Sequence, residues 1–171
     1  MKTVGSIRPS SPQLSREMAS SINSKVPQNI FELGAGEGAI TRELLSAMHP
    51  ESKLYVFEIN ENFLEALKEL DDHRLILIHD SAEFLTRHLS ELKLEQVDVV
   101  VSALPTVLFD KEVARKIIRD SYDALRSGGL FVQFHYSRVN KKVYEEIFDE
   151  VKVKFIIGNL PPAFVYVCRK K

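Results

Sequence analysis

The segment that most constrains the fold of this chain is IFELGAGEGAIT, residues 30–41. It opens with an apolar run that predicts a short buried strand, and three glycines follow, Gly34, Gly36 and Gly38. Glycine adopts positive φ freely and lets the backbone approach a ligand closely, so these residues predict a tight turn. Apolar residues at helical spacing resume at Ile40, and the unpaired N–H groups of a helix start favour a polar or anionic ligand group. The segment therefore predicts a nucleotide-type cofactor site.

The residues around these glycines leave two kinds of cofactor open. Gly34, Gly36 and Ala39 fit the spacing of a dinucleotide fingerprint, which keeps an NAD-dependent oxidoreductase among the alternatives. Glu32 lies two residues before the first glycine and favours a different ligand. A carboxylate at the mouth of the first strand suits a cationic group better than a pyrophosphate, because like charges repel.

Acidic residues also follow the next two apolar runs. Glu58 comes 24 residues after Gly34, about the separation expected of a carboxylate that accepts hydrogen bonds from both hydroxyls of a ribose. Asp80 and Ser81 stand at the end of the third run, and Asp80 can also be the N-cap of a helix over residues 81–92. We expect Glu58 to contribute to cofactor binding.

Length and composition limit the alternatives. The chain has 171 residues and a formal net charge of −1, which predicts one domain over residues 1–171 and gives no basic field that favours nucleic acid. Its one cysteine excludes an internal disulfide, and its five histidines show no metal-binding spacing, so no metal is expected. The sequence contains no apolar run of transmembrane length and no apolar signal region, which predicts a cytoplasmic protein.

Apolar runs and helical patterns alternate over residues 28–168, the predicted core of the domain. Five strand–helix units of this kind are typical of an α/β fold with a doubly wound sheet. A long helix is predicted over 109–125, with glycine-rich residues 126–129 as its C-cap and the fifth strand at 130–136. The last two strands are joined by a link too short for a helical crossover, so an antiparallel hairpin is expected from 152–157 and 163–168.

Residues 1–25 form a predicted arm and helix ahead of this core. The serines and prolines of residues 1–12 predict a turn or an arm, and Ser11 followed by Pro12 is typical of a helix start. One face of this helix then carries Leu14, Met18 and Ile22. Three interpretations stay open for that face: cover for the sheet, a lid over the cofactor, or a membrane contact.

Glu32 and the three glycines after it resemble motif I of the class I S-adenosylmethionine-dependent methyltransferases. The resemblance implies a Rossmann-like sheet of seven strands in the order 3-2-1-4-5-7-6, with a C-terminal antiparallel hairpin and helices on both faces. It implies S-adenosylmethionine as cofactor and S-adenosylhomocysteine as product, with the methionine part near Glu32 and the adenine near Asp80. Hydroxyls near the N-terminus are expected to bind the cofactor carboxylate. The expected cofactor-binding residues are Glu32, Gly34, Ala35, Gly36, Glu58, Ile59, Asp80, Ser81, Ser102, Ser10 and Ser11.

Four segments, residues 5–11, 102–105, 132–136 and 159–166, together resemble the bacterial and archaeal phospholipid N-methyltransferases, which methylate phosphatidylethanolamine. This implies an amine-bearing substrate at a membrane surface, and a protein that lies peripherally at the inner membrane face. Arg8 is expected to pair with a phosphate or with the cofactor carboxylate. The substrate contacts expected are Arg8, Leu104, Pro105 and Tyr166.

Methylation of an alkyl amine requires that the amine lose a proton. With a pKa of about 10 it is mostly protonated at neutral pH, so the site must desolvate it or pass its proton to water or a base. Tyr136 and His135 end the predicted fifth strand, where only one of them can share a face with Phe134. We prefer Tyr136 as the catalytic residue, because an aromatic face also stabilises a sulfonium or a methylated ammonium, and His135 is the alternative.

Other functions stay open beside the methylation of a lipid amine. Members of the phospholipid family commonly carry a longer amphipathic N-terminal helix than the four residues that precede Gly5 here, which favours a soluble small-molecule acceptor. An rRNA adenine dimethylase is disfavoured by the near-zero net charge and by Ser102, which replaces the Asn or Asp of the nucleobase-binding motif. Outside the methyltransferases, an NAD-binding oxidoreductase and a binding module without catalysis are the alternatives.

Overall fold

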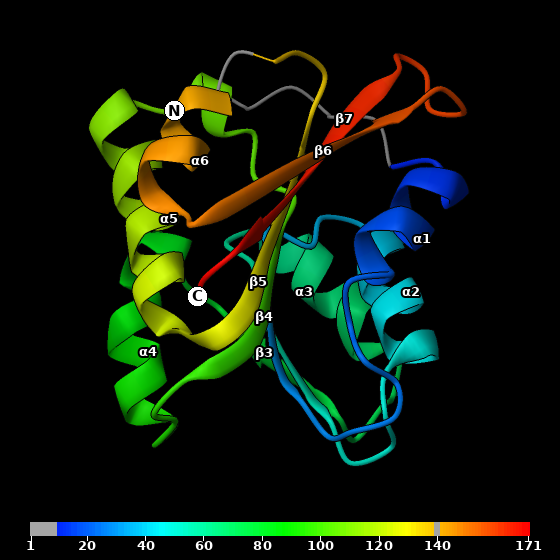
Figure 1. The fold of residues 1–171 in the computed structure, drawn as a ribbon. Helices are drawn as coiled ribbons and strands as arrows, with labels where there is room; N and C mark the ends of the chain where they lie inside the picture. The colour runs from blue at the N-terminus through cyan, green and yellow to red at the C-terminus, as the bar shows by residue number, and fades with distance from the viewer. Residues whose placement is uncertain (1–9, 139–140) are drawn as a thin grey trace.

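The computed structural model describes residues 10–138 and 141–171. Its strands are β1 (Asn29–Leu33), β2 (Lys53–Phe57), β3 (Leu75–Ile78), β4 (Val97–Ser102), β5 (Leu125–His135), β6 (Glu150–Ile156) and β7 (Ala163–Arg169). They form one seven-stranded sheet in the order β3-β2-β1-β4-β5-β7-β6 (Figure 1). Strands β1 to β5 pair in parallel, whereas β7 is antiparallel to both β5 and β6. The predicted strand order and C-terminal hairpin are confirmed.

The strands that carry the predicted site end in register. Leu33 of β1 pairs with Phe57 of β2 and with Ser102 of β4, and Phe57 pairs with Ile78 of β3. The segments that follow these four strands therefore leave the sheet at one edge, which we call the carboxyl edge. Ligands of open α/β sheets bind at this edge.

Helices cover both faces of the sheet, as predicted (Figure 1). One face carries α1 (Pro12–Ala19), α2 (Ala39–Ala47) and α3 (Glu61–Lys68), and the other carries α4 (Leu85–Glu91), α5 (Lys111–Ala124) and α6 (Lys141–Ile147). Successive strand residues point to opposite faces, so Ile30 enters the core under α1 and Phe31 enters the core under α5. No helix among the described residues is both long and apolar enough to cross a membrane.

Helix α1 begins as its sequence predicts. The Ser11 hydroxyl caps it by accepting a hydrogen bond from the Leu14 N–H at 3.2 Å, and Pro12 occupies the first turn. Leu14 and Met18 are fully buried in the core that α1 shares with α2. The apolar face of α1 is therefore used to cover the sheet.

The glycine C-cap predicted for the helix before β5 is wrong. Leu125 is already extended and pairs with Val97 of β4, so α5 ends at Ala124 and residues 126–129 belong to β5. The Gly128 N–H donates to the carbonyl of Lys170 at 2.7 Å. The last carbonyls of α5 are satisfied instead by the Leu125 N–H and by Lys170 Nζ, which donates to the Tyr122 carbonyl at 2.9 Å.

Candidate active site

The segment after β1 forms the predicted glycine turn. Gly34, Gly36 and Gly38 have φ values of 75°, 54° and 81°, which L side chains rarely adopt. A Cβ atom on Gly36 would meet no atom within 4 Å, so the space over this residue is open. A Cβ atom on Gly34 would lie 2.6 Å from Leu104 Cδ2, so the loop after β4 packs directly on the turn. The turn thus offers room for a ligand at Gly36, between the ends of β1 and β2.

Glu58, at the end of β2, holds this turn in place. One carboxylate oxygen accepts a hydrogen bond from the Gly36 N–H at 2.9 Å. The other accepts from the N–H groups of Ile59 and Asn60, at 2.9 Å each. Each carboxylate oxygen has two lone pairs, so these three hydrogen bonds leave Glu58 one lone pair, on the oxygen that binds the Gly36 N–H, to accept from a ligand hydroxyl.

Glu32 of β1 is fully buried, and neither of its carboxylate oxygens has a hydrogen-bond partner among the described residues. Burial raises the pKa of Glu32 to about 8; the nearby Thr41 hydroxyl lowers this pKa and the Glu58 carboxylate raises it further. The Thr41 hydroxyl is close enough to act on this pKa without meeting hydrogen-bond geometry. A buried carboxyl without a partner is costly, and a cationic ligand group would satisfy it.

The raised pKa of Glu32 predicts that stability falls as pH rises. The unfolded chain releases this proton near pH 4.5 and the folded protein keeps it until about pH 8, so between these values the folded state binds more protons. We expect the free energy of unfolding to fall by up to about 1.4 kcal/mol per pH unit within this window. Urea titrations between pH 4.5 and about pH 8 should show this fall in the free energy of unfolding for the wild type and not for Glu32→Gln. Parallel pH profiles for the two proteins would contradict the assignment.

Asp80 and Ser81 follow β3, and the capping role considered for Asp80 is wrong. Ser81 is the N-cap of the 3₁₀ turn η1 (Ala82–Phe84), where its hydroxyl accepts from the Glu83 N–H at 3.3 Å. Asp80 instead accepts from the Ser81 N–H at 2.8 Å, lies 2.7 Å from His88 Nε2 and pairs with Arg87. The hydrogen bond with His88 is the main cause that lowers the pKa of Asp80, which keeps this carboxylate charged.

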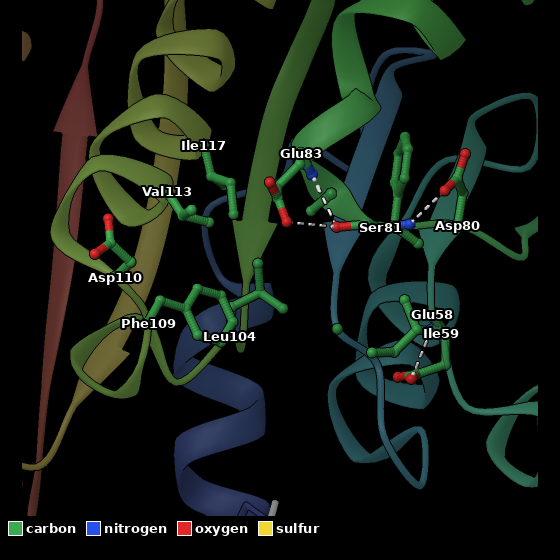
Figure 2. Close-up of a pocket in the computed structure, with 13 residues that line it drawn as sticks. Glu58, Ile59, Asp80, Ser81, Glu83, Leu104, Phe109, Asp110, Val113 and Ile117 are labelled. Atoms are coloured by element: carbon green, nitrogen blue, oxygen red, sulfur yellow. Dashed lines mark hydrogen bonds between the residues drawn. The ribbon is translucent and has the colours of Figure 1, made fainter. Parts of the chain in front are cut away.

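These strand ends surround a cavity of about 310 Å³. Figure 2 shows its two sides facing each other, with Glu58, Ile59, Asp80 and Ser81 opposite Leu104, Phe109, Val113 and Ile117. Polar groups line one side of the cavity, and apolar side chains from α5 and the loop before it line the other. An apolar slot beside a few fixed polar groups suits a purine nucleoside.

The loop after β4 lies between this cavity and the end of β5. Ser102 is buried, and its hydroxyl accepts from the Leu104 N–H at 3.4 Å. Gln133 of β5 donates from Nε2 to the Leu104 carbonyl at 3.0 Å. Pro105 then precedes a second 3₁₀ turn, η2 (Thr106–Leu108). Leu104 and Pro105 are thereby fixed beside the glycine turn.

Strand alternation separates the two residues predicted at the end of β5. Tyr136 is 40% exposed, and its ring meets that of Phe134 edge-on at 5.6 Å. His135 points to the opposite face, where it is buried with Nε2 2.7 Å from the Tyr144 hydroxyl, and burial lowers its pKa to about 4. Tyr166 is fully buried beside His135. Among His135, Tyr136 and Tyr166, Tyr136 is therefore the one that reaches the surface.

The remaining predicted residues occupy the margins of the site. The Ser11 N–H donates to Asn159 Oδ1 at 3.0 Å, which ties the start of α1 to the β6–β7 turn, and Ser10 immediately precedes it. Ala35 is buried within the glycine turn, where its carbonyl accepts from the Gly38 N–H at 3.0 Å. Arg8 lies outside the described residues, so its expected pairing stays a prediction.

Sequence reasoning missed part of this site. Phe109, Val113 and Ile117 recur at helical spacing, which was a usable signal, but the same pattern describes a helix that faces only the core. Two polar residues in the site, Thr41 and Gln133, were not predicted as site residues, although Gln133 belongs to the resembling segment 132–136. Glu83 and Asp110 also line the cavity and were not predicted as site residues.

The sheet order, the glycine turn after β1 and the carboxylates after β2 and β3 define the class I methyltransferase fold. In agreement, the family described as "Methyltransferase domain" matches residues 30–129. The chain belongs to this family and is an S-adenosylmethionine-dependent methyltransferase.

Two relatives extend this comparison. The chain is 36% identical over 169 residues to an ornithine lipid N-methyltransferase of Singulisphaera acidiphila, covering 97% of this chain and 88% of the relative. It is 26% identical over 146 residues to a polyamine aminopropyltransferase of Saccharolobus islandicus, covering 77% of this chain but 46% of that relative.

Solved structures show the same fold. A precorrin-6y C5,15-methyltransferase from Geobacter metallireducens has a TM-score of 0.76 at 16% identity, covering 100% of this chain and 94% of its own. The N-methyltransferase NodS from Bradyrhizobium japonicum has a TM-score of 0.75 at 16% identity, covering 91% and 93%.

Proposed function

We propose that this methyltransferase transfers the methyl group of S-adenosylmethionine to the primary amine of a membrane lipid headgroup, such as that of phosphatidylethanolamine. The observation that carries this proposal is the 36% identity to an ornithine lipid N-methyltransferase over 97% of the chain. Ornithine and ethanolamine headgroups both end in a primary alkyl amine, so a site that aligns and desolvates a primary amine can methylate either one.

The residues around the glycine turn fit S-adenosylmethionine. When bound, the cofactor supplies an activated methyl group on a sulfonium. Glu32 offers its unpartnered carboxylate to the positively charged part of the cofactor, and Glu58 accepts from a ribose hydroxyl. The open space at Gly36 takes the amino acid end, and the apolar slot beside Asp80 takes the adenine. The flanking contacts are assigned to Gly34, Ala35, Ile59, Ser81, Ser102, Ser10 and Ser11.

The acceptor amine is placed at the loop after β4, next to Tyr136. Leu104 and Pro105 remove water from the amine, which lowers its pKa and favours loss of its proton. The exposed Tyr136 ring stabilises the ammonium that carries the new methyl group, by a cation–π interaction. The residues of the site thus align and desolvate the nucleophile, which is the main catalytic task when the methyl donor is already activated.

This role predicts different outcomes for two substitutions of Tyr136. Tyr136→Ala removes the aromatic face and should lower kcat by about tenfold. Tyr136→Phe keeps the ring and should stay within about twofold of the wild type. Initial rates at saturating cofactor measure both. An equal loss in the two variants would assign the role to the hydroxyl instead, as a proton acceptor.

The proposal is tested with methyl-labelled S-adenosylmethionine and lipid vesicles. We expect label in the organic phase with vesicles that contain phosphatidylethanolamine or ornithine lipid. Matched vesicles of phosphatidylcholine, which lacks a primary amine, should take up none. A protein that binds the cofactor and labels neither amine lipid would contradict the proposal.

A soluble amine is the second candidate acceptor. The partial likeness to a polyamine aminopropyltransferase supports a soluble amine, although this chain spans about half the length of that relative, 46%. Putrescine and free ethanolamine therefore form two further arms of the labelling experiment. Label in these arms without label in lipid would favour the soluble acceptor.

A further inference from the structure

Exposed apolar side chains gather on one half of the carboxyl edge. Nine large apolar residues of the described chain are exposed, and six of them lie where β4, β5, β6 and β7 meet this edge. The six are Val107, Leu108, Tyr136, Phe155, Ile157 and Leu160. Val26, which precedes β1, is on the opposite edge of the sheet. The exposed apolar residues are therefore concentrated on one side of the molecule, the side of the proposed acceptor site.

The β6–β7 turn has the reverse of the usual arrangement of a surface turn. Its aliphatic side chains Ile157 and Leu160 are 74% and 78% exposed, whereas its polar side chain Asn159 is 5% exposed. Asn159 accepts from the Ser11 N–H at 3.0 Å and donates to the Pro161 carbonyl at 2.7 Å. The hydrogen bonds of Asn159 keep this polar side chain buried, and Ile157 and Leu160 face the solvent. This is the opposite of what contact with water favours.

The second apolar segment is η2, after β4. Val107 and Leu108 are 51% and 69% exposed, and they lie in the chain between Leu104 and Phe109, which line the cavity. In Figure 1 the β6–β7 turn is at the upper right, beside the start of α1. Arg138, which is exposed, lies over the Phe164 ring at 5.1 Å, one strand pair behind the β6–β7 turn. In a bilayer, apolar acyl chains lie below a layer of negatively charged phosphates. The exposed aliphatic side chains of the β6–β7 turn, with the Arg138 cation set back from them, have the matching order.

We propose that Val107, Leu108, Ile157 and Leu160 form a membrane-docking surface, which seats the carboxyl edge on a lipid bilayer. This inference rests on the proposed function, because a headgroup reaches the site while its acyl chains stay in the bilayer only if the bilayer adjoins the site. The apolar side of α1 is not available for this contact, since Leu14 and Met18 are fully buried in the core. The hairpin and η2 take this role instead.

A fluorescence experiment locates the contact directly. The chain contains no tryptophan, so Leu160→Trp and Val26→Trp each introduce a single tryptophan, at opposite edges of the sheet. With vesicles of phosphatidylethanolamine and phosphatidylglycerol, the emission of Leu160→Trp should shift to the blue and be quenched by brominated acyl chains. The emission of Val26→Trp should do neither. Equal responses, or none at Leu160→Trp, would overturn the proposal.

A loss-of-binding variant separates this inference from the proposed function. In vesicle sedimentation without cofactor, Ile157→Ser/Leu160→Ser should bind more than about tenfold more weakly than the wild type, and Val26→Ser should bind as the wild type does. All three should bind S-adenosylhomocysteine alike. Wild-type binding by the double variant would overturn the docking surface, and so would a loss of self-association alone, which would indicate a second copy of the chain. Normal vesicle binding by a wild type that methylates no lipid would contradict the proposed function and leave the docking surface standing.

Discussion

Glu58→Ala is expected to weaken the binding of S-adenosylmethionine and S-adenosylhomocysteine by more than about a hundredfold. The variant removes the acceptor assigned to the cofactor ribose, a charge-assisted hydrogen bond of about 1.5–3 kcal/mol. It also removes the carboxylate that accepts from the Gly36 N–H at 2.9 Å, so the glycine turn keeps the hydrogen bond from the Gly34 N–H to the Phe57 carbonyl but loses this second link to the end of β2. Calorimetric titration with either ligand measures the loss.

The matched control is Glu37→Ala. Glu37 belongs to the same turn and carries the same charge, but its side chain is exposed. Its removal should change the affinity by no more than about threefold, as is typical of surface charges. Thermal melts of both variants establish that the fold is retained. A folded Glu58→Ala protein with wild-type affinity would contradict the ribose assignment.

Glu32→Gln is expected to weaken cofactor binding by about tenfold to a hundredfold while leaving the fold intact. The amide has the shape of the carboxyl but cannot pair with a cation. Because the carboxyl is buried and without a partner in the described structure, its replacement should not destabilise the protein.

Proton release gives a second readout for Glu32. Its pKa of about 8 keeps it largely protonated at neutral pH, so pairing with a cationic ligand group must expel the proton. Titrations in buffers of different ionisation enthalpy should detect proton release from the wild type and none from Glu32→Gln. Tight NAD binding by the wild type, or unchanged affinity in the variant, would contradict the role assigned to Glu32.

The strands were predictable because each is a short apolar run, whereas their order was expected from the resemblance to class I methyltransferases. Apolar runs alone do not give this order, because β2 and β1 lie between the consecutive strands β3 and β4. The glycine turn was predictable as well, because the turn requires positive φ and glycine adopts it freely. The end of α5 was not predictable from local signals. Residues 126–129 have good C-cap chemistry, but Leu125 before them already pairs with β4, and Gly128 and Gly129 pair with Lys170.

The acidic residues of the site were predictable from the sequence, whereas the apolar residues that line or surround it were less so. Asp80 and Ser81 are both good N-caps, and the choice between them depends on Arg87 and His88, seven and eight residues further along, which bind Asp80. Ile157 and Leu160 resemble core residues in the sequence. Their exposure becomes evident only when Asn159 is seen to occupy the inside of the turn.

The central claim is that the acceptor is an amine on a lipid, and a competition experiment tests it most directly. Phosphatidylethanolamine vesicles and free ethanolamine are offered together, at equal amine concentration, with methyl-labelled S-adenosylmethionine. The account predicts that label enters the organic phase almost entirely, because the same amine is presented at the membrane surface on which the site is seated. Label confined to the aqueous amine would contradict it.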